Sequence, residues 1–152
     1  MRKFIVTVAV VCLASAGVAL AQEHWTEGPV WSVSFYRTTP GHFDDYMKYL
    51  RTHYIVTTAE AKKQGLILDS KVFVKTPADA NDWDVAIATL LSSYGKALDY
   101  NQADDAKSKA IQAQHWKTPD LDKQREMTAP RFEMRKALGT TYTREVNLRP
   151  MP

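Results

Sequence analysis

Cysteine is almost absent from this chain of 152 residues, because Cys12 is its only one. Cys12 lies in an N-terminal segment with the features of a cleaved export signal, so we expect the mature protein to have none. That excludes disulfide bonds, a thiol nucleophile and thiolate metal ligands. A charge excess is lacking as well, since residues 22–152 contain 18 basic and 17 acidic residues. A near-neutral domain gives no reason to expect nucleic acid or an anionic membrane as a partner.

Motifs that mark well-known active sites are also missing. The sequence has no glycine-rich phosphate loop, no dinucleotide fingerprint and no G-x-S-x-G nucleophile turn. The histidines expected in the mature chain do not show a metal-ligand spacing such as H-x-x-x-H or H-x-H; they are His24, His42, His53 and His115. We therefore predict no metal site and no cofactor.

The first 21 residues have the three parts of a secretory signal peptide. Two basic residues come first, residues 4–13 are apolar and uncharged, and an A-x-A cleavage site at 19–21 precedes Gln22. The apolar run is too short and too diluted by alanine and glycine to serve as a membrane anchor. We expect a signal peptide at 1–21 and a periplasmic or secreted protein that has no membrane contact after cleavage.

The remaining 131 residues are enough for one domain with a core. We interpret residues 22–29 as a polar N-terminal tail and residues 30–150 as the domain. Alternating apolar and polar residues predict four strands, at 30–37, 66–75, 83–91 and 140–149. A helical period predicts helices at 42–64, 94–116 and 118–138. We expect Gly65 to end the first helix and Pro130 to interrupt the last.

This order of elements is β-α-β-β-α-β, with an extra helix before the last strand. It predicts an α+β fold of the ferredoxin-like, split βαβ type, with a four-stranded antiparallel sheet. The strand at 83–91 is apolar on both faces in its centre, which is typical of an interior strand.

Three segments also resemble a known family. PGHFDDYMKYLRTHY, KKQGLILDSKVF and NDWDVAIATLL, which follow the opening strand, are similar to the dimeric α/β-barrel superfamily. That superfamily includes antibiotic-biosynthesis-type monooxygenases, EthD-like proteins and NIPSNAP-type proteins. The resemblance covers roughly residues 30–100 and the closing strand. It implies a homodimer in which two sheets pack together, with a pocket between each sheet and its helices.

His53 is the most promising candidate for chemistry. It follows Tyr46 by seven residues, about two turns of helix, so the two side chains share one side of the helix with Tyr49 or Leu50. If that side faces the sheet, His53 with Tyr46 would form a catalytic pair, with His53 as general base or haem ligand. The alternative is a partly buried histidine bonded to a carbonyl or a tyrosine.

Aromatic side chains on the strands are candidates for ligand binding. They are Trp31, Phe35, Tyr36 and Trp83. Strand aromatics either line an apolar pocket or pack in a core or a dimer interface. The sequence therefore favours an exported homodimer that binds a small apolar molecule. The competing hypothesis is a monooxygenase or isomerase, cofactor-independent or haem-dependent, that acts on an apolar aromatic substrate through His53.

Overall fold

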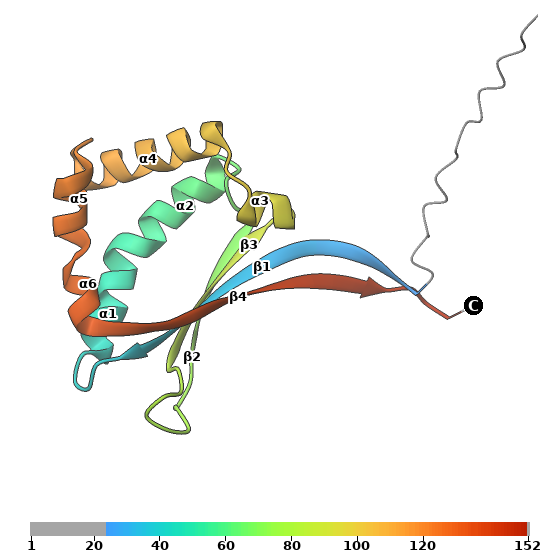
Figure 1. The fold of residues 1–152 in the computed structure, drawn as a ribbon, viewed down its shortest axis with the longest axis horizontal. Helices are drawn as coiled ribbons and strands as arrows, with labels where there is room; N and C mark the ends of the chain where they lie inside the picture. The colour runs from blue at the N-terminus through green and yellow to red at the C-terminus, as the bar shows by residue number, and fades with distance from the viewer. Residues whose placement is uncertain (1–23, 152) are drawn as a thin grey trace, which may run out of the picture.

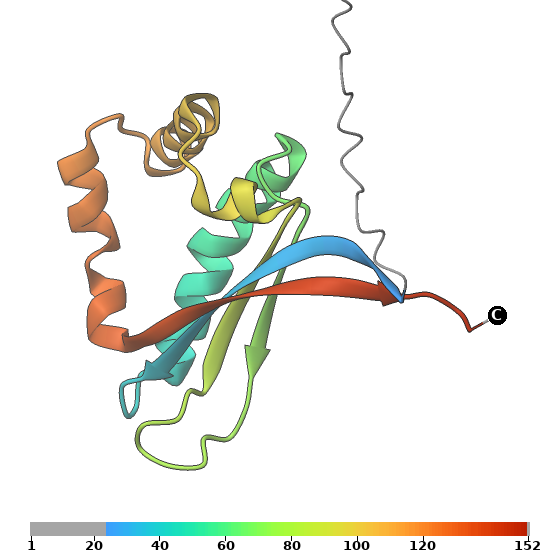
Figure 2. The ribbon, with the colours of Figure 1, turned by 45° about the vertical axis from the view of Figure 1, so that its right-hand side comes forward.

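The structure is a computed structural model that describes residues 24–151. The predicted signal peptide at 1–21, and the first two residues of the predicted tail, lie outside the described residues. In the described part, four strands form one curved sheet, and the helices gather on one of its faces (Figure 1; Figure 2).

The sheet contains β1 (Trp25–Thr38), β2 (Asp69–Val74), β3 (Val85–Leu91) and β4 (Arg135–Leu148). Their order across the sheet is β2-β3-β1-β4, and every neighbouring pair is antiparallel. The predicted α+β class and four-stranded antiparallel sheet are thus confirmed, and the arrangement is compatible with a ferredoxin-like fold. β3 is an interior strand, as its apolar sequence predicted.

Several predicted boundaries are wrong. β1 begins at Trp25, inside the segment predicted to be a tail, and the helix predicted to reach Leu138 ends at Met134. Lysine, alanine and leucine at 136–138 favour a helix by propensity, but β4 pairs with β1 from Arg135 onward. Ladder pairing along a neighbouring strand outweighs the small helix propensities of single residues.

The ends of β1 and β4 extend beyond the other two strands as a two-stranded arm (Figure 1). Trp25 pairs with Leu148, and Arg144 forms an ion pair with Glu27 across the arm. Val146 and Leu148 are 49% and 79% exposed. A two-stranded ribbon is marginally stable by itself in water, so the arm exposes apolar surface with little support.

The predicted helix at 42–64 is continuous in space but changes its winding. It comprises α1 (Phe43–Tyr49), a π-helical turn η1 (Leu50–Tyr54) and α2 (Ile55–Lys63). Gly65, with φ of +72°, follows its C-cap, as predicted. A π turn bonds residue i to i+5 and so holds one more residue than an α turn.

The segment between β3 and β4 contains four helices. They are α3 (Tyr94–Leu98), α4 (Gln102–Trp116), α5 (Leu121–Thr128) and α6 (Pro130–Met134). Pro130 separates α5 from α6, as predicted, since it lacks the N–H that a continuous helix needs. α4 packs beside α2, and α6 packs beside α1.

Asp84 joins the start of β3 to the end of β1 through hydrogen bonds. Its carboxylate is buried and accepts hydrogen bonds from the backbone N–H of Thr38, at 2.9 Å, and from the Thr38 hydroxyl. Its own N–H donates to the Tyr36 carbonyl at 3.1 Å. β3 itself begins at Val85 rather than at the predicted Trp83, because the Trp83 N–H bonds locally to the Asp82 carboxylate.

The two faces of the sheet have different surroundings. Val85 and Val72 face the helices and form a core with Tyr46 and Leu50. The opposite face carries no helix (Figure 2). We call it the open sheet face and define it by Trp31, Val33, Phe35, Lys71, Phe73, Ala86, Ala88 and Leu90, which alternate with the helix-facing residues along β1, β2 and β3.

Candidate functional site

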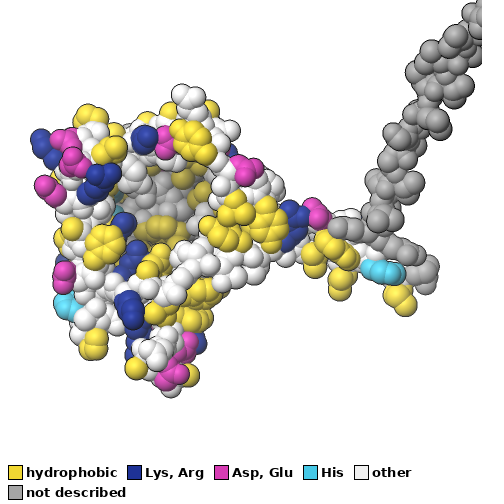
Figure 3. Space-filling model, in the orientation of Figure 1, with side chains coloured by type: hydrophobic (Ala, Val, Ile, Leu, Met, Phe, Trp, Pro, Cys, Tyr) yellow, Lys and Arg dark blue, Asp and Glu magenta, His cyan; other side chains and the backbone are white. Residues whose placement is uncertain are grey.

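A pocket of about 320 Å³ lies between the helix-facing side of the sheet and the surrounding helices. Figure 3 shows a hollow on this side of the molecule, with Lys or Arg side chains at its border. We call it the arginine–tyrosine pocket. It is lined by Ser34, Tyr36, Tyr46, Tyr49, Leu50, His53, Tyr54, Thr57, Ile87, Thr89, Gln112, Trp116, Thr128, Arg131 and Arg135. Its volume is at the lower end of the range for small-molecule sites.

Tyr46 is completely buried, yet its hydroxyl has no hydrogen-bond partner. Burial raises the pKa of this hydroxyl above its usual range, although Arg135 and Arg131 act in the opposite direction. The hydroxyl is therefore protonated at physiological pH and is free to donate a hydrogen bond. A buried hydroxyl without a partner is uncommon, and its place in a pocket marks it as a group that could meet a ligand.

Two arginines stand beside Tyr46. The Arg135 guanidinium lies over the Tyr36 ring, with Cζ 3.5 Å from the ring centroid, and its Cζ is 4.9 Å from the centroid of Tyr46. Nη1 of Arg135 and Nε of Arg131 are buried without a hydrogen-bond partner. No ion pair within residues 24–151 includes either arginine. The pocket therefore holds two cations without a protein counter-charge.

His53 belongs to an aromatic cluster at another part of the pocket. Its Nδ1 is 2.9 Å from Nε2 of His115, and its ring stacks on Trp116 with centroids 4.6 Å apart. The ring centroid of Tyr49 lies 4.7 Å from that of His53. Burial, followed by the neighbouring His115, lowers the pKa of His53 below 6.5. Near neutral pH the imidazole is therefore neutral and able to accept a proton.

The lowered pKa of His53 predicts a pH-dependent stability. Because the unfolded chain binds a proton at His53 more readily than the folded chain, stability is complete above the unfolded value of 6.5. It declines as the pH falls through 6.5 toward the folded pKa. We expect His53→Gln to reduce the loss of stability between about pH 7.5 and 5.5, measured by urea unfolding. His24→Gln, which replaces an exposed histidine, should leave the wild-type loss unchanged; equal curves for His53→Gln and wild type would contradict the assignment.

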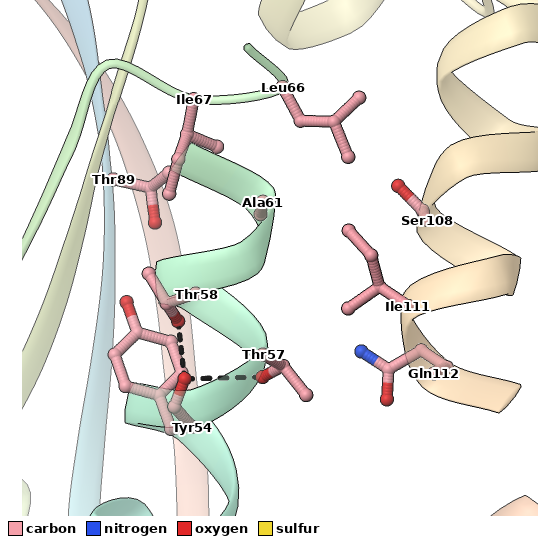
Figure 4. A pocket seen from close by; sticks show the side chains of 10 residues that line it. All are labelled: Tyr54, Thr57, Thr58, Ala61, Leu66, Ile67, Thr89, Ser108, Ile111 and Gln112. Atoms are coloured by element: carbon pink, nitrogen blue, oxygen red, sulfur yellow. Dashed lines mark hydrogen bonds between the residues drawn. The ribbon is translucent and has the colours of Figure 1, made fainter. Parts of the chain in front are cut away.

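A second concavity, the α2–α4 groove, adjoins this pocket. It has a volume of about 250 Å³ and shares Tyr54, Thr57, Thr89 and Gln112 with the arginine–tyrosine pocket. In Figure 4, Ser108, Ile111 and Gln112 extend from α4 toward α2, with Leu66 above them. The Thr58 hydroxyl donates to the Tyr54 carbonyl, and the Thr57 hydroxyl donates to the carbonyls of His53, at 2.9 Å, and Tyr54, at 3.1 Å. The groove thus extends the pocket with a less polar section.

The structure brings some predicted site residues together and separates others. Tyr46, His53 and Tyr36 all line the arginine–tyrosine pocket. His53 and Tyr54, which are neighbours in the π turn, both line it. Trp31, Phe35 and Trp83 belong to the other side of the sheet, where Phe35 packs on Trp83 with centroids 5.4 Å apart. The four predicted ligand-binding aromatics therefore do not form one site.

Trp31 lines a separate hollow on the open sheet face. Its ring nitrogen donates to the Glu145 carboxylate at 2.6 Å, and Lys71 Nζ lies 5.1 Å from the ring centroid. Lys75 Nζ lies 4.6 Å from the Trp83 centroid in the same way. The indole N–H of Trp31 is thus paired, and a lysine lies over the ring of each tryptophan.

Three pocket residues do not stand out in the sequence: Arg131, Arg135 and Trp116. Arg131 and Arg135 are four residues apart, but one lies in α6 and the other begins β4. The sequence gives little indication that the two arginines share a site, because two arginines at this spacing are ordinary on a solvated helix. Trp116 ends α4, where its Nε1 donates to Gln112 at 3.1 Å.

Comparisons with known proteins leave the family open. No family profile, curated protein or solved structure matches this chain. Within residues 24–151, no helix is long and apolar enough to cross a membrane. The same residues contain no cluster of three or more His, Cys, Asp or Glu side chains suited to a metal ion.

Proposed function

We propose that this protein binds a small organic molecule in the arginine–tyrosine pocket. The observation that carries the proposal is the pocket itself, about 320 Å³ of space whose wall combines aromatic rings with buried polar groups that have no partner. Small-molecule sites typically combine such an apolar wall with a few convergent polar groups. The adjoining α2–α4 groove offers room for an extended part of the ligand.

A pocket-filling variant tests the proposal. Ser34 lines the pocket from β1, so Ser34→Phe should occupy part of its space. We expect at least about a tenfold loss of affinity for small aromatic probes (benzoate, benzamide, benzyl alcohol), measured by equilibrium dialysis, since 1.4 kcal/mol corresponds to that factor. Ser32→Phe introduces the same ring two residues earlier on the same face, outside the pocket lining, and should bind as wild type does. Equal binding by both variants would place the ligand elsewhere.

The proposal includes a homodimer of the dimeric α/β-barrel type, with a ferredoxin-like sheet in each subunit. Two observations support it. The open sheet face has large apolar side chains and no covering helix, and Phe73 on it is 48% exposed. The arm formed by β1 and β4 likewise exposes Val146 and Leu148. Packing two open sheet faces together would remove apolar surface from water on both subunits.

Export to the periplasm or the exterior is also part of the proposal. Its support is the sequence of residues 1–21, with two basic residues, an apolar run and an A-x-A site. The intact mass of the protein recovered from outside the cytoplasm tests it directly. We expect a chain that begins at Gln22, and a full-length chain there would contradict cleavage.

Acid–base catalysis on the bound molecule is the second candidate function. It is favoured by the neutral His53 imidazole at the pocket wall. Nδ1 of His53 lies 2.9 Å from Nε2 of His115 and the ring stacks on Trp116, which leaves Nε2 of His53 to exchange a proton with the bound molecule. Recovery of each bound probe unchanged, measured by NMR after prolonged incubation, favours binding alone, whereas conversion lost in His53→Gln favours catalysis.

A further inference from the structure

The arginine–tyrosine pocket concentrates the unpaired polar groups of the described chain. Residues 24–151 contain five buried side-chain nitrogen or oxygen atoms without a hydrogen-bond partner. Three of them belong to Tyr46, Arg131 and Arg135, which all line this one pocket. Burying a cation or a hydroxyl without a partner is unfavourable, so a shared partner at this position would relieve all three.

The charge of that partner follows from the lining. Two guanidinium groups contribute, and the described residues that line the pocket include no Asp or Glu. The Tyr46 hydroxyl adds a neutral donor, because burial raises its pKa and keeps its proton in place. His53 is the only other titratable cation in the lining, and its lowered pKa leaves it neutral near pH 7. A set of donors with a net positive charge selects an anion.

The residue types of the lining favour a carboxylate over a phosphate. The Arg135 guanidinium lies over the Tyr36 ring and keeps an unpartnered Nη1 that can donate to an anion. A guanidinium pairs with a carboxylate or a phosphate, so the rest of the lining decides between the two. Phosphate sites commonly use backbone N–H groups of glycine-rich loops or helix N-termini. The lining includes no glycine or lysine among the described residues, and Pro130 at the start of α6 has no N–H.

The rest of the lining defines the body of the ligand. Tyr49, Trp116 and Ile87 provide aromatic and aliphatic walls in the same pocket. Flat rings pack well against such side chains. Resting on the proposed binding function, we propose that the pocket binds a small aromatic carboxylate, whose carboxylate accepts hydrogen bonds from Arg131, Arg135 and the Tyr46 hydroxyl.

Matched probes separate the charge from the body of the ligand. Benzoate and phenylacetate would be titrated into the purified protein beside benzamide and phenylacetamide, which have similar shapes without the charge. Isothermal titration calorimetry should show at least about tenfold tighter binding of each carboxylate, because charge-assisted hydrogen bonds are roughly twice as strong as neutral ones. Equal affinity for the carboxylates and the amides would overturn the carboxylate assignment while leaving the proposed binding function intact. Tighter binding of phenyl phosphate than of benzoate would also overturn it.

Variants of the three donors locate the site. Arg131→Met and Arg135→Met should weaken benzoate binding at least about tenfold, and Tyr46→Phe about fivefold, with little effect on benzamide. Tyr46→Phe keeps the test decisive if an arginine variant unfolds, because the hydroxyl that it removes has no partner in the protein. Arg125→Met, at an exposed arginine paired with Asp122, is the matched control and should bind as wild type does.

Two results would contradict the assignment of these donors. Unchanged benzoate affinity in both Tyr46→Phe and Arg131→Met would place any anion site elsewhere and overturn the inference. Absence of binding by every probe, charged or neutral, would overturn the proposed function together with it.

Discussion

Replacing Asp84 with alanine is expected to lower the free energy of unfolding by about 3 kcal/mol. The change leaves the backbone N–H and the hydroxyl of buried Thr38 without their acceptor. It also removes the nearest carboxylate to Arg37, at 3.9 Å. Thermal or urea unfolding followed by circular dichroism measures the loss, with a fall in Tm of roughly 10 °C for a domain of this size.

Two further variants serve as comparisons for this prediction. Asp84→Asn keeps the shape and one acceptor, so it should lose less than half as much stability. Asp122→Ala removes an exposed carboxylate that pairs with Arg125, and it should change stability by less than about 0.5 kcal/mol. A loss at Asp84→Ala no larger than that at Asp122→Ala would contradict the role of Asp84 in joining β3 to β1.

Replacing Phe73 with lysine is expected to convert the proposed dimer into a monomer. Phe73 lies on the open sheet face of β2, level with Ala86 on the neighbouring β3 and with Phe35 on β1 beyond it. A lysine there would place an unpaired charge against the partner sheet and remove a large apolar contact. Central aromatic contacts contribute about 2 kcal/mol or more, so the dimer should dissociate at least about 30-fold more readily. Light scattering coupled to size exclusion measures the mass directly.

The design separates dimerisation from folding. Phe73 is half exposed in a single subunit, so the lysine variant should remain folded with nearly unchanged stability. Leu98→Lys introduces the same charge at a residue of α3 that is 60% exposed, away from the open sheet face, and should remain dimeric. A wild-type protein that is monomeric at micromolar concentration would contradict the dimer proposal.

Local periodicity accounts for the part of the site that the sequence predicted. Tyr46 and His53 are seven residues apart on one helix, and helical geometry alone places them on one side. Both line the pocket. The π turn that also brings Tyr54 to the pocket has no comparable signal, since LRTHY is compatible with an ordinary helix.

The strand aromatics show where residue type and periodicity conflict. Alternation along β1 already places Trp31 and Phe35 on one face and Tyr36 on the other. Grouping all of them as ligand-binding residues by aromatic type disagrees with that alternation. The structure follows the alternation, because only Tyr36 lines the arginine–tyrosine pocket. In a sheet with helices on one face, the period of the strand decides which aromatics can share a site.

The arginines depend on the path of the chain between β3 and β4. Arg131 and Arg135 reach Tyr46 only because α6 packs beside α1 and β4 then pairs with β1. Both packings are long-range, and no local pattern encodes them. For the same reason the start of β4 at Arg135 differs from the predicted helix end at Leu138. Local sequence therefore predicted that Tyr46 and His53 share the site, but not that Arg131 and Arg135 give it a positive charge.

Three of the four tryptophan indoles test the central claim most directly, because they report on both faces of the sheet. Trp116 lines the arginine–tyrosine pocket, whereas Trp31 lies on the open sheet face with Trp83 near it. Each indole N–H gives its own signal in a ¹H–¹⁵N NMR spectrum during titration with benzoate or benzamide. If the pocket binds the probe, the Trp116 signal shifts with saturation and those of Trp31 and Trp83 remain in place. Shifts at Trp31 and Trp83 with an unchanged Trp116 would contradict the claim, because the ligand would then occupy the open sheet face.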